Sequence, residues 1–253
     1  MKLTPATFLS CLCASGSANA EPFDEMKLSD RQLASKLHKL RTKGYFTIPV
    51  APGTKRFLEA QSRSMPNDPF QKHALDFRNS SYEQTGTALA TRVVSALVAA
   101  ELPLRPQEFE IRRPVAQAAS EWHQDKAPKF LTCLTTLEGE ATEFVSPAVF
   151  KGKFKQTGDV PPVIEPVAGR TAIEKDIRTT KPDKFYIFAA LGVEDPHVPK
   201  LVHRAPGQAG RSIFLARWME HRHPGEPSRL PNPPSSAAPA GAVPAPEPTK
   251  NPA

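Results

Sequence analysis

Apolar residues recur at helical spacing in the first hundred residues of the chain. Leu33, Leu37 and Leu40 lie on one face of a predicted helix, which begins after a capping-box sequence at residues 29–32 and stops at Gly44. A similar apolar face, later in the chain, predicts a longer helix that ends near residue 102. A short helix is expected between them, at about residues 54–64, and residues 65–84 are polar and irregular.

The pattern changes after Pro106, where short segments rich in aromatic and β-branched residues are bounded by proline or glycine. With a strand expected at Tyr45–Val50, these segments indicate an α+β, mainly β fold: an antiparallel sandwich or barrel with two or three N-terminal helices packed on one sheet. The predicted strands are Phe109–Arg113, Glu121–Asp125, Phe130–Thr136, Thr142–Val145, Val163–Val167, Phe185–Ala189, Lys200–His203 and Ser212–Trp218.

The amino-acid composition differs between the C-terminal segment and the rest of the chain. Ten of its 28 prolines lie between Pro224 and Pro252, and residues 221–253 offer few large aliphatic side chains, so this segment is expected to be a disordered tail. Residues 26–220 are long enough for one domain with its own core. No apolar run reaches the length of a membrane span, and three cysteines do not make a disulfide scaffold.

Residues 1–25 form a leader with two interpretations. Lys2, an apolar stretch at Phe8–Ala14 and an A-x-A sequence ending at Ala20 resemble a signal peptide cleaved after Ala20, which predicts a periplasmic or secreted protein. A second Met-Lys-Leu begins at Met26, just before the first predicted helix. If the true start is Met26, the protein is expected to be cytoplasmic.

The net charge is modest. The formal charge is +7 from 33 Lys+Arg and 26 Asp+Glu, and residues 21–220 carry 29 of the former and 24 of the latter, which leaves +5. No block of five like charges occurs, so no nucleic-acid partner is expected. The oligomeric state is not readable from the sequence.

The candidate chemistry begins with the sequence Trp122-His123-Gln124-Asp125. In a strand, His123 and Asp125 would point to the same face and could ligate one metal ion together. His203 lies on a second predicted strand about eighty residues later. Two histidines and one carboxylate, with the other coordination positions open, are the facial triad of non-haem Fe(II) oxygenases.

Two arginines follow the distal histidine. Arg211 comes eight residues after His203 and begins an apolar strand, and Arg217 has the same parity on that strand. A guanidinium beside the metal could bind a carboxylate through two hydrogen bonds. His197, in a proline-rich loop, is expected to be a loop histidine and not a ligand, and Cys133 is expected to be a buried apolar residue.

These features resemble the 2-oxoglutarate/Fe(II)-dependent dioxygenase superfamily, whose fold is a double-stranded β-helix (jelly roll). The resemblance runs in order through most of residues 33–220. Two short motifs, Thr-Glu-Phe at residues 142–144 and His-Arg-Ala-Pro at residues 203–206, are also similar to a bacterial family of unknown function. The matching segments are Leu40–Pro49, Phe109–Arg113, Trp122–Asp125, Leu134–Leu137, Gly139–Phe144, Pro182–Phe188 and His203–Trp218.

The resemblance implies that His123, Asp125 and His203 bind Fe(II) and that Arg211 binds the distal carboxylate of 2-oxoglutarate as cosubstrate. Arg217 competes for this role, because the spacing from His203 to Arg211 is short for the superfamily. The resemblance also implies hydroxylation of a small-molecule or protein substrate, coupled to release of succinate and CO₂. The sequence does not identify this substrate. The alternative is a secreted or periplasmic jelly-roll binding or interaction protein without turnover.

Overall fold

The computed structural model describes residues 21–65, 75–77, 80–113, 121–125, 129–146, 152–155, 163–166, 176–205 and 211–221. Most of the predicted leader (residues 1–20) and the predicted tail beyond residue 221 lie outside these ranges. Among the described residues, no helix combines the length and the apolar character that crossing a membrane requires.

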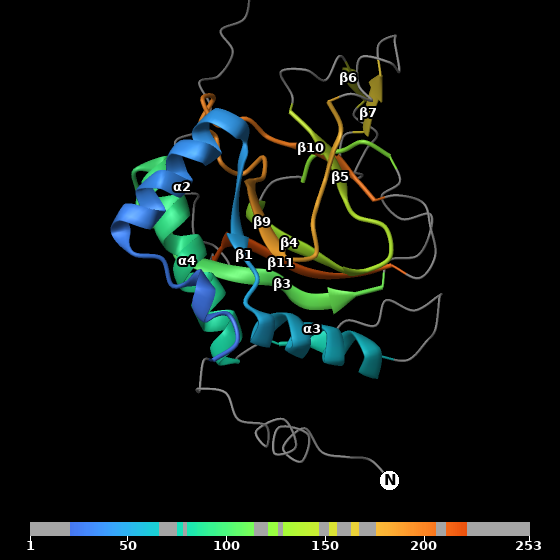
Figure 1. The fold of residues 1–253 in the computed structure, drawn as a ribbon. Coiled ribbons are helices and arrows are strands. Elements are labelled where there is room, and N and C mark those ends of the chain that lie inside the picture. The colour runs from blue at the N-terminus through green and yellow to red at the C-terminus, as the bar shows by residue number, and fades with distance from the viewer. Residues whose placement is uncertain are drawn as a thin grey trace, which may run out of the picture. The chain divides into compact units, whose positions relative to one another are not determined.

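A six-stranded antiparallel sheet forms the body of the fold (Figure 1). Strands β4 and β11 are at its centre and pair with each other over most of their length. Strand β11 also pairs with β3 over most of its length, whereas β4 pairs with β9 only at residues 131–134. In spatial order the strands are β1 (Tyr45–Pro49), β9 (Lys184–Ala189), β4 (Lys129–Glu138), β11 (Ser212–Glu220), β3 (Leu104–Arg112) and β2 (Leu75–Asp76).

A smaller antiparallel sheet has the order β10 (Val202–Arg204), β5 (Glu143–Val145) and β8 (Arg178–Thr179). His123 extends this sheet through a single bridge to His203. A separate pair consists of β6 (Gly152–Lys155) and β7 (Val163–Pro166).

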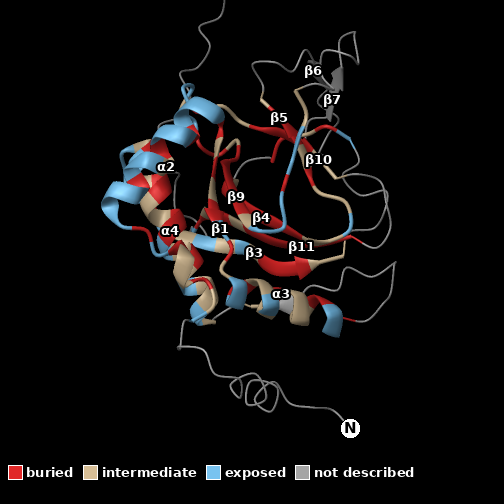
Figure 2. Ribbon diagram, viewed as in Figure 1, coloured by how far each residue is buried: buried red, intermediate tan, exposed pale blue. Residues whose placement is uncertain are grey.

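Three helices and a short 3₁₀ turn lie N-terminal to most of the strands. They are η1 (Asp24–Met26), α2 (Asp30–Lys43), α3 (Pro52–Ser64) and α4 (Ser81–Val98). Helix α2 has the predicted capping box at Ser29 and Gln32, and it ends at Gly44, whose φ of 80° suits a residue without a Cβ. Helices α3 and α4 contact β3 and β4, and Figure 2 shows that their buried residues face the sheet.

The two faces of the large sheet carry different cores. The face toward the helices is aromatic: the Phe23 ring lies with its centroid 5.8, 5.7 and 5.3 Å from those of Phe109, Phe185 and Phe214. The opposite face joins the small sheet through a second apolar cluster, with Phe144 of β5 among side chains of the large sheet. The other buried members of this inter-sheet cluster are Leu134, Tyr186, Phe188, Leu201, Ile213 and Leu215.

The predicted α+β, mainly β class is confirmed, and the local predictions differ in several respects. Strands β6 and β8 were not predicted, and β3 begins at Leu104 and not at Phe109. Glu121–Asp125 was expected to be a strand, but it pairs only at His123, through one isolated bridge. Within the segment expected to be irregular, β2 forms an edge of the large sheet and α4 already begins at Ser81. Short polar segments of this kind carry no periodic signal, so their pairing depends on tertiary contacts.

Candidate metal centre

The two histidines are held together by the backbone. The amide of His123 donates to the carbonyl of His203, and the amide of His203 donates back, both at 2.9 Å. This places residues 80 positions apart directly opposite one another. The imidazole ring centroids are 4.4 Å apart, and the His203 ring also lies 5.1 Å from that of Phe188 in the inter-sheet cluster.

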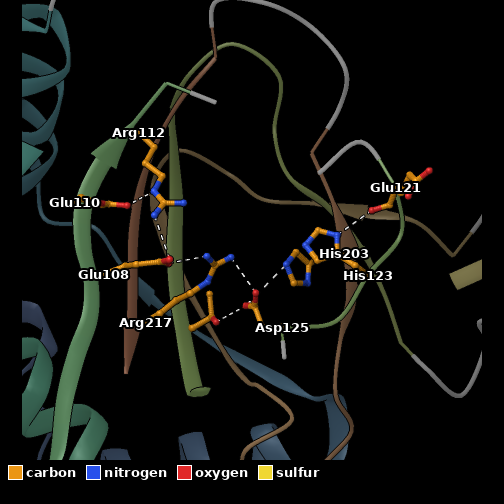
Figure 3. A network of polar contacts seen from close by, with 9 residues as sticks. Glu108, Glu110, Arg112, Glu121, His123, Asp125, His203 and Arg217 are labelled. Atoms are coloured by element: carbon orange, nitrogen blue, oxygen red, sulfur yellow. Dashed lines mark hydrogen bonds and ion pairs between the residues drawn. The ribbon is translucent and has the colours of Figure 1, made fainter. Parts of the chain in front are cut away.

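Asp125 completes the group (Figure 3). One candidate ligand atom from each of His123, Asp125 and His203 lies within 4.8 Å of the others. His203 Nε2 is 3.9 Å from Asp125 Oδ2. The Nδ1–H of His123 donates to the carbonyl of Glu121 at 2.9 Å, which leaves Nε2 as the free ligand atom. Two imidazoles and one carboxylate fit a divalent transition metal with open positions.

His203 is set up as a neutral ligand. Its pKa is lowered to about 3, chiefly because the ring is buried, with His123 and Arg217 also disfavouring the charged form; Asp125 and the backbone of Leu201 act in the opposite direction. A histidine must be unprotonated to bind a metal ion. His203 therefore meets this requirement throughout the neutral pH range.

Asp125 is set up as an ionised ligand. Burial alone would raise its pKa, but the charges of Arg217, His203 and Lys129 and the hydrogen bond from Thr132 hold it well below its usual value. The Thr132 hydroxyl donates to Oδ2, and Arg217 Nη2 lies 2.9 Å from Oδ1. Both carboxylate oxygens thus have protein partners that fix the orientation of the group.

A chain of alternating charges extends from Asp125 toward β3. Arg217 Nη1 lies 2.6 Å from Glu108 Oε2, Glu108 Oε1 lies 3.1 Å from Arg112, and Arg112 also pairs with Glu110 (Figure 3). Burial opposes the charge of Arg217, but Asp125 and Glu108 raise its pKa, so it stays positive. Arg217 is the charge partner of a candidate metal ligand.

Arg211 has different partners from Arg217. It is 3 % exposed, and its guanidinium donates to the Thr142 hydroxyl, while its Nε has no hydrogen-bond partner among the described residues. Thr142 is two residues before Phe144, the cross-strand neighbour of His203. Thr142 directly precedes β5, so this hydrogen bond connects Arg211 to the small sheet beside the strand that pairs with β10.

The structure places most of the predicted site residues close to one another. The structure brings His123, Asp125 and His203 together, and it also places Arg217 beside Asp125. Ser212 bonds Ser62 of α3 and Ile213 joins the inter-sheet cluster, so the strand alternates as predicted and both arginines share the inner face. His197 is exposed and lies outside the triad, whereas Cys133 is fully buried.

Three polar residues of the site were not predicted: Glu108, Thr132 as a partner of Asp125, and Thr142. Thr132 pairs with Arg217 across β4 and β11, so strand register would have revealed it. Register cannot be read from the sequence, because a bulge interrupts the pairing of β11 at Trp218.

The lowered pKa of His203 predicts that acid destabilises the metal-free protein. Between about pH 3 and 6.5 the unfolded chain binds this proton and the folded chain does not, so the free energy of unfolding falls as the pH is lowered. We expect a contribution on the order of 1 kcal/mol per pH unit. Urea unfolding at pH 7 and pH 5 should show a smaller difference for His203→Asn than for the wild type. Equal differences would contradict a buried, neutral His203.

Comparison with known proteins finds similar folds only among solved structures. No family model matches the sequence, and no curated protein matches it. An oxidoreductase of the 2OG-Fe(II) oxygenase family from Burkholderia pseudomallei is 14% identical, with a TM-score of 0.43 over 77% of this chain and 93% of that one. A Pseudomonas putida prolyl-4-hydroxylase is 15% identical, with a TM-score of 0.40 over 76% and 95%.

The epimerase SnoN, whose structure holds Fe3+, alpha ketoglutarate and nogalamycin RO, is 17% identical, with a TM-score of 0.45 over 83% of this chain and 93% of its own. The fold and the site together define a mainly antiparallel α+β protein with a two-histidine, one-carboxylate centre.

Proposed function

We propose that this chain is a non-haem Fe(II)- and 2-oxoglutarate-dependent oxygenase that hydroxylates a substrate still to be identified. The observation that carries the proposal is the convergence of His123, Asp125 and His203 within 4.8 Å, with the carboxylate ionised and His203 neutral. A second buried arginine, Arg211, adds the kind of group that would bind an oxo-acid cosubstrate.

We further infer that the fold is a double-stranded β-helix. In such a fold two four-stranded sheets face each other, and successive strands alternate between them. The order β3-β11-β4-β9 within the large sheet, and the order His123-β10-β5-β8 in the small one, support this arrangement. The inter-sheet cluster would then be the interior of the barrel, with the metal centre at one end of it.

The side chains have distinct roles in this proposal. His123 Nε2, His203 Nε2 and Asp125 Oδ2 would hold the metal, while Thr132 and Arg217 keep the carboxylate oriented. Iron bound there would activate dioxygen and couple oxidation of the substrate to decarboxylation of 2-oxoglutarate. The apolar side chains beside His203, such as Phe188 and Phe144, would keep water away from the reacting groups.

Arg211 is the best candidate for binding the distal carboxylate of 2-oxoglutarate. Burial lowers its pKa only to about 10, so it is charged at neutral pH. Its unpartnered Nε and the neighbouring Thr142 hydroxyl are donors that a carboxylate could accept from. Arg217 is less suited, because both of its Nη atoms already pair with carboxylates, those of Glu108 and Asp125.

Arg211→Met is therefore expected to weaken 2-oxoglutarate binding about 10- to 100-fold, as for loss of a charged hydrogen bond. Calorimetric titration of 2-oxoglutarate into the Mn²⁺-loaded protein measures this directly. Arg41→Met, which alters an exposed arginine bonded to Ala96, serves as the control and should bind like the wild type. Unchanged binding by the Arg211 variant would remove it from the site.

The proposal as a whole is tested by metal analysis of protein purified without oxygen, followed by thermal melting. We expect one Fe(II) to bind per chain and 2-oxoglutarate to raise the melting temperature of the loaded protein. Absence of iron binding, together with no effect of 2-oxoglutarate, would exclude this function.

A further inference from the structure

We propose that Arg204 is a positioning residue that sets the separation of His123 and His203 from the side of the small sheet facing away from the metal centre. This inference rests on the proposed function, because it concerns the same two ligands. It assigns a role to Trp122, Arg204 and Glu143, which together we call the outer clamp.

The outer clamp crosses three strand segments of the small sheet. The guanidinium carbon of Arg204 lies 4.5 Å from the centroid of the Trp122 ring, within the range of a cation–π contact. Arg204 Nε also donates to Glu143 Oε2 at 2.6 Å, and the two residues are cross-strand neighbours on β10 and β5. One side chain thus connects the His123 segment, β10 and β5.

The members of the outer clamp are the immediate neighbours of the triad. Trp122 precedes His123, Arg204 follows His203, and Glu143 precedes Phe144, which pairs with His203. Adjacent residues of extended chain point to opposite faces, so the clamp lies behind the two imidazoles. The apolar part of this face is formed by Trp122, Val145 and Val202.

The backbone alone ties the His123 segment weakly to β10. Among the described residues, one bridge with two hydrogen bonds connects them. A side chain on the same outer face adds a further contact: Gln124 Nε2 donates to the carbonyl of Lys200 at 2.7 Å. A short, singly bridged segment can tilt or slide, and the Trp122–Arg204 contact opposes that movement at the residues next to both ligands.

Loss of the clamp should therefore appear in metal affinity and not only in stability. Residues that orient metal ligands typically change affinity 10- to 100-fold when altered. Arg204→Met keeps an unbranched apolar side chain but removes the guanidinium, and with it both the cation–π contact and the ion pair. Arg204→Lys keeps a cation over Trp122 and near Glu143, so it should restore most of the affinity.

Arg92→Met is the matched control. Arg92 also makes an ion pair, 2.7 Å from Asp30, and its side chain is 37% exposed against 35% for Arg204. It lies on α4, outside the small sheet. Both substitutions should lower the melting temperature of the metal-free protein slightly, because partly exposed ion pairs contribute little.

The experiment is calorimetric titration of Ni²⁺ into each metal-free protein. We expect the Kd of Arg204→Met to rise at least about tenfold, with Arg204→Lys and Arg92→Met close to the wild type. Equal Kd values for Arg204→Met and Arg92→Met would overturn the inference. If Arg204→Met does not fold, Glu143→Gln decides instead: a raised Kd supports the clamp and an unchanged one refutes it. If the wild type itself binds no Ni²⁺, the proposed function fails, which is a separate result.

Discussion

Replacement of His123 by alanine is expected to weaken metal binding at least about 100-fold, which is the upper end of the effect of an outer partner. The substitution removes one of three ligand atoms, and the described residues form no other group of metal-ligating side chains that could replace it. The rest of the structure should tolerate the change, because the ring is only half-buried and its Nδ1–H donates to a backbone carbonyl, that of Glu121. Titration with Ni²⁺ measures the loss.

His197→Ala is the matched control for this change. His197 lies in the loop before β10 and is exposed, so its removal should leave the Kd unchanged. Circular dichroism of both variants checks that the fold is retained. If His123→Ala and wild type bound Ni²⁺ equally, the triad would not be the metal centre.

Replacement of Phe23 by alanine is expected to lower the free energy of unfolding by about 3–5 kcal/mol, the usual cost of removing a buried phenylalanine. Phe23 is fully buried among Phe109, Phe185 and Phe214, at the centre of the aromatic face of the large sheet. Its amide is bonded to the Thr54 hydroxyl, and its φ of 73° is unusual for a bulky residue. Urea unfolding monitored by circular dichroism measures the effect.

Phe57→Ala provides the comparison, because Phe57 is half-buried and contacts Phe77 and Tyr82 at the edge of the same aromatic region. The free energy of unfolding should fall clearly less for Phe57→Ala than for Phe23→Ala.

A comparison of two shortened chains tests the same residue. A chain that starts at Met26 lacks Phe23, and its free energy of unfolding should fall at least as much as that of Phe23→Ala. A chain that starts at Glu21 retains Phe23. Equal stabilities of these two chains would show that Phe23 does not support the core.

The helices and the triad were predictable for different reasons. Helix α2 is specified locally, by three leucines at helical spacing between a capping box and Gly44. The triad was predicted from the pairing of His123 with Asp125 at a strand-like spacing and from a second histidine on a later strand. The structure brings the three together even though the first segment is a single bridge and not a strand.

The surroundings of the triad were not predictable, because they depend on contacts between segments far apart in the chain. Arg217 reaches Asp125 and Glu108 only because β11 lies beside β3. The sequence offered Arg211 for the cosubstrate, with Arg217 as a competitor, and the structure gives the two arginines different partners. Thr142 likewise meets Arg211 across 69 positions, which no local pattern records.

The central claim is that this centre turns over 2-oxoglutarate, and the most direct test is succinate production followed by NMR. The account predicts succinate from the purified protein only when Fe(II), 2-oxoglutarate and dioxygen are all present. The signal should disappear in His123→Ala and persist in His197→Ala. Binding of iron and 2-oxoglutarate without succinate under any condition, including with candidate substrates added, would contradict the claim and favour a binding protein without turnover.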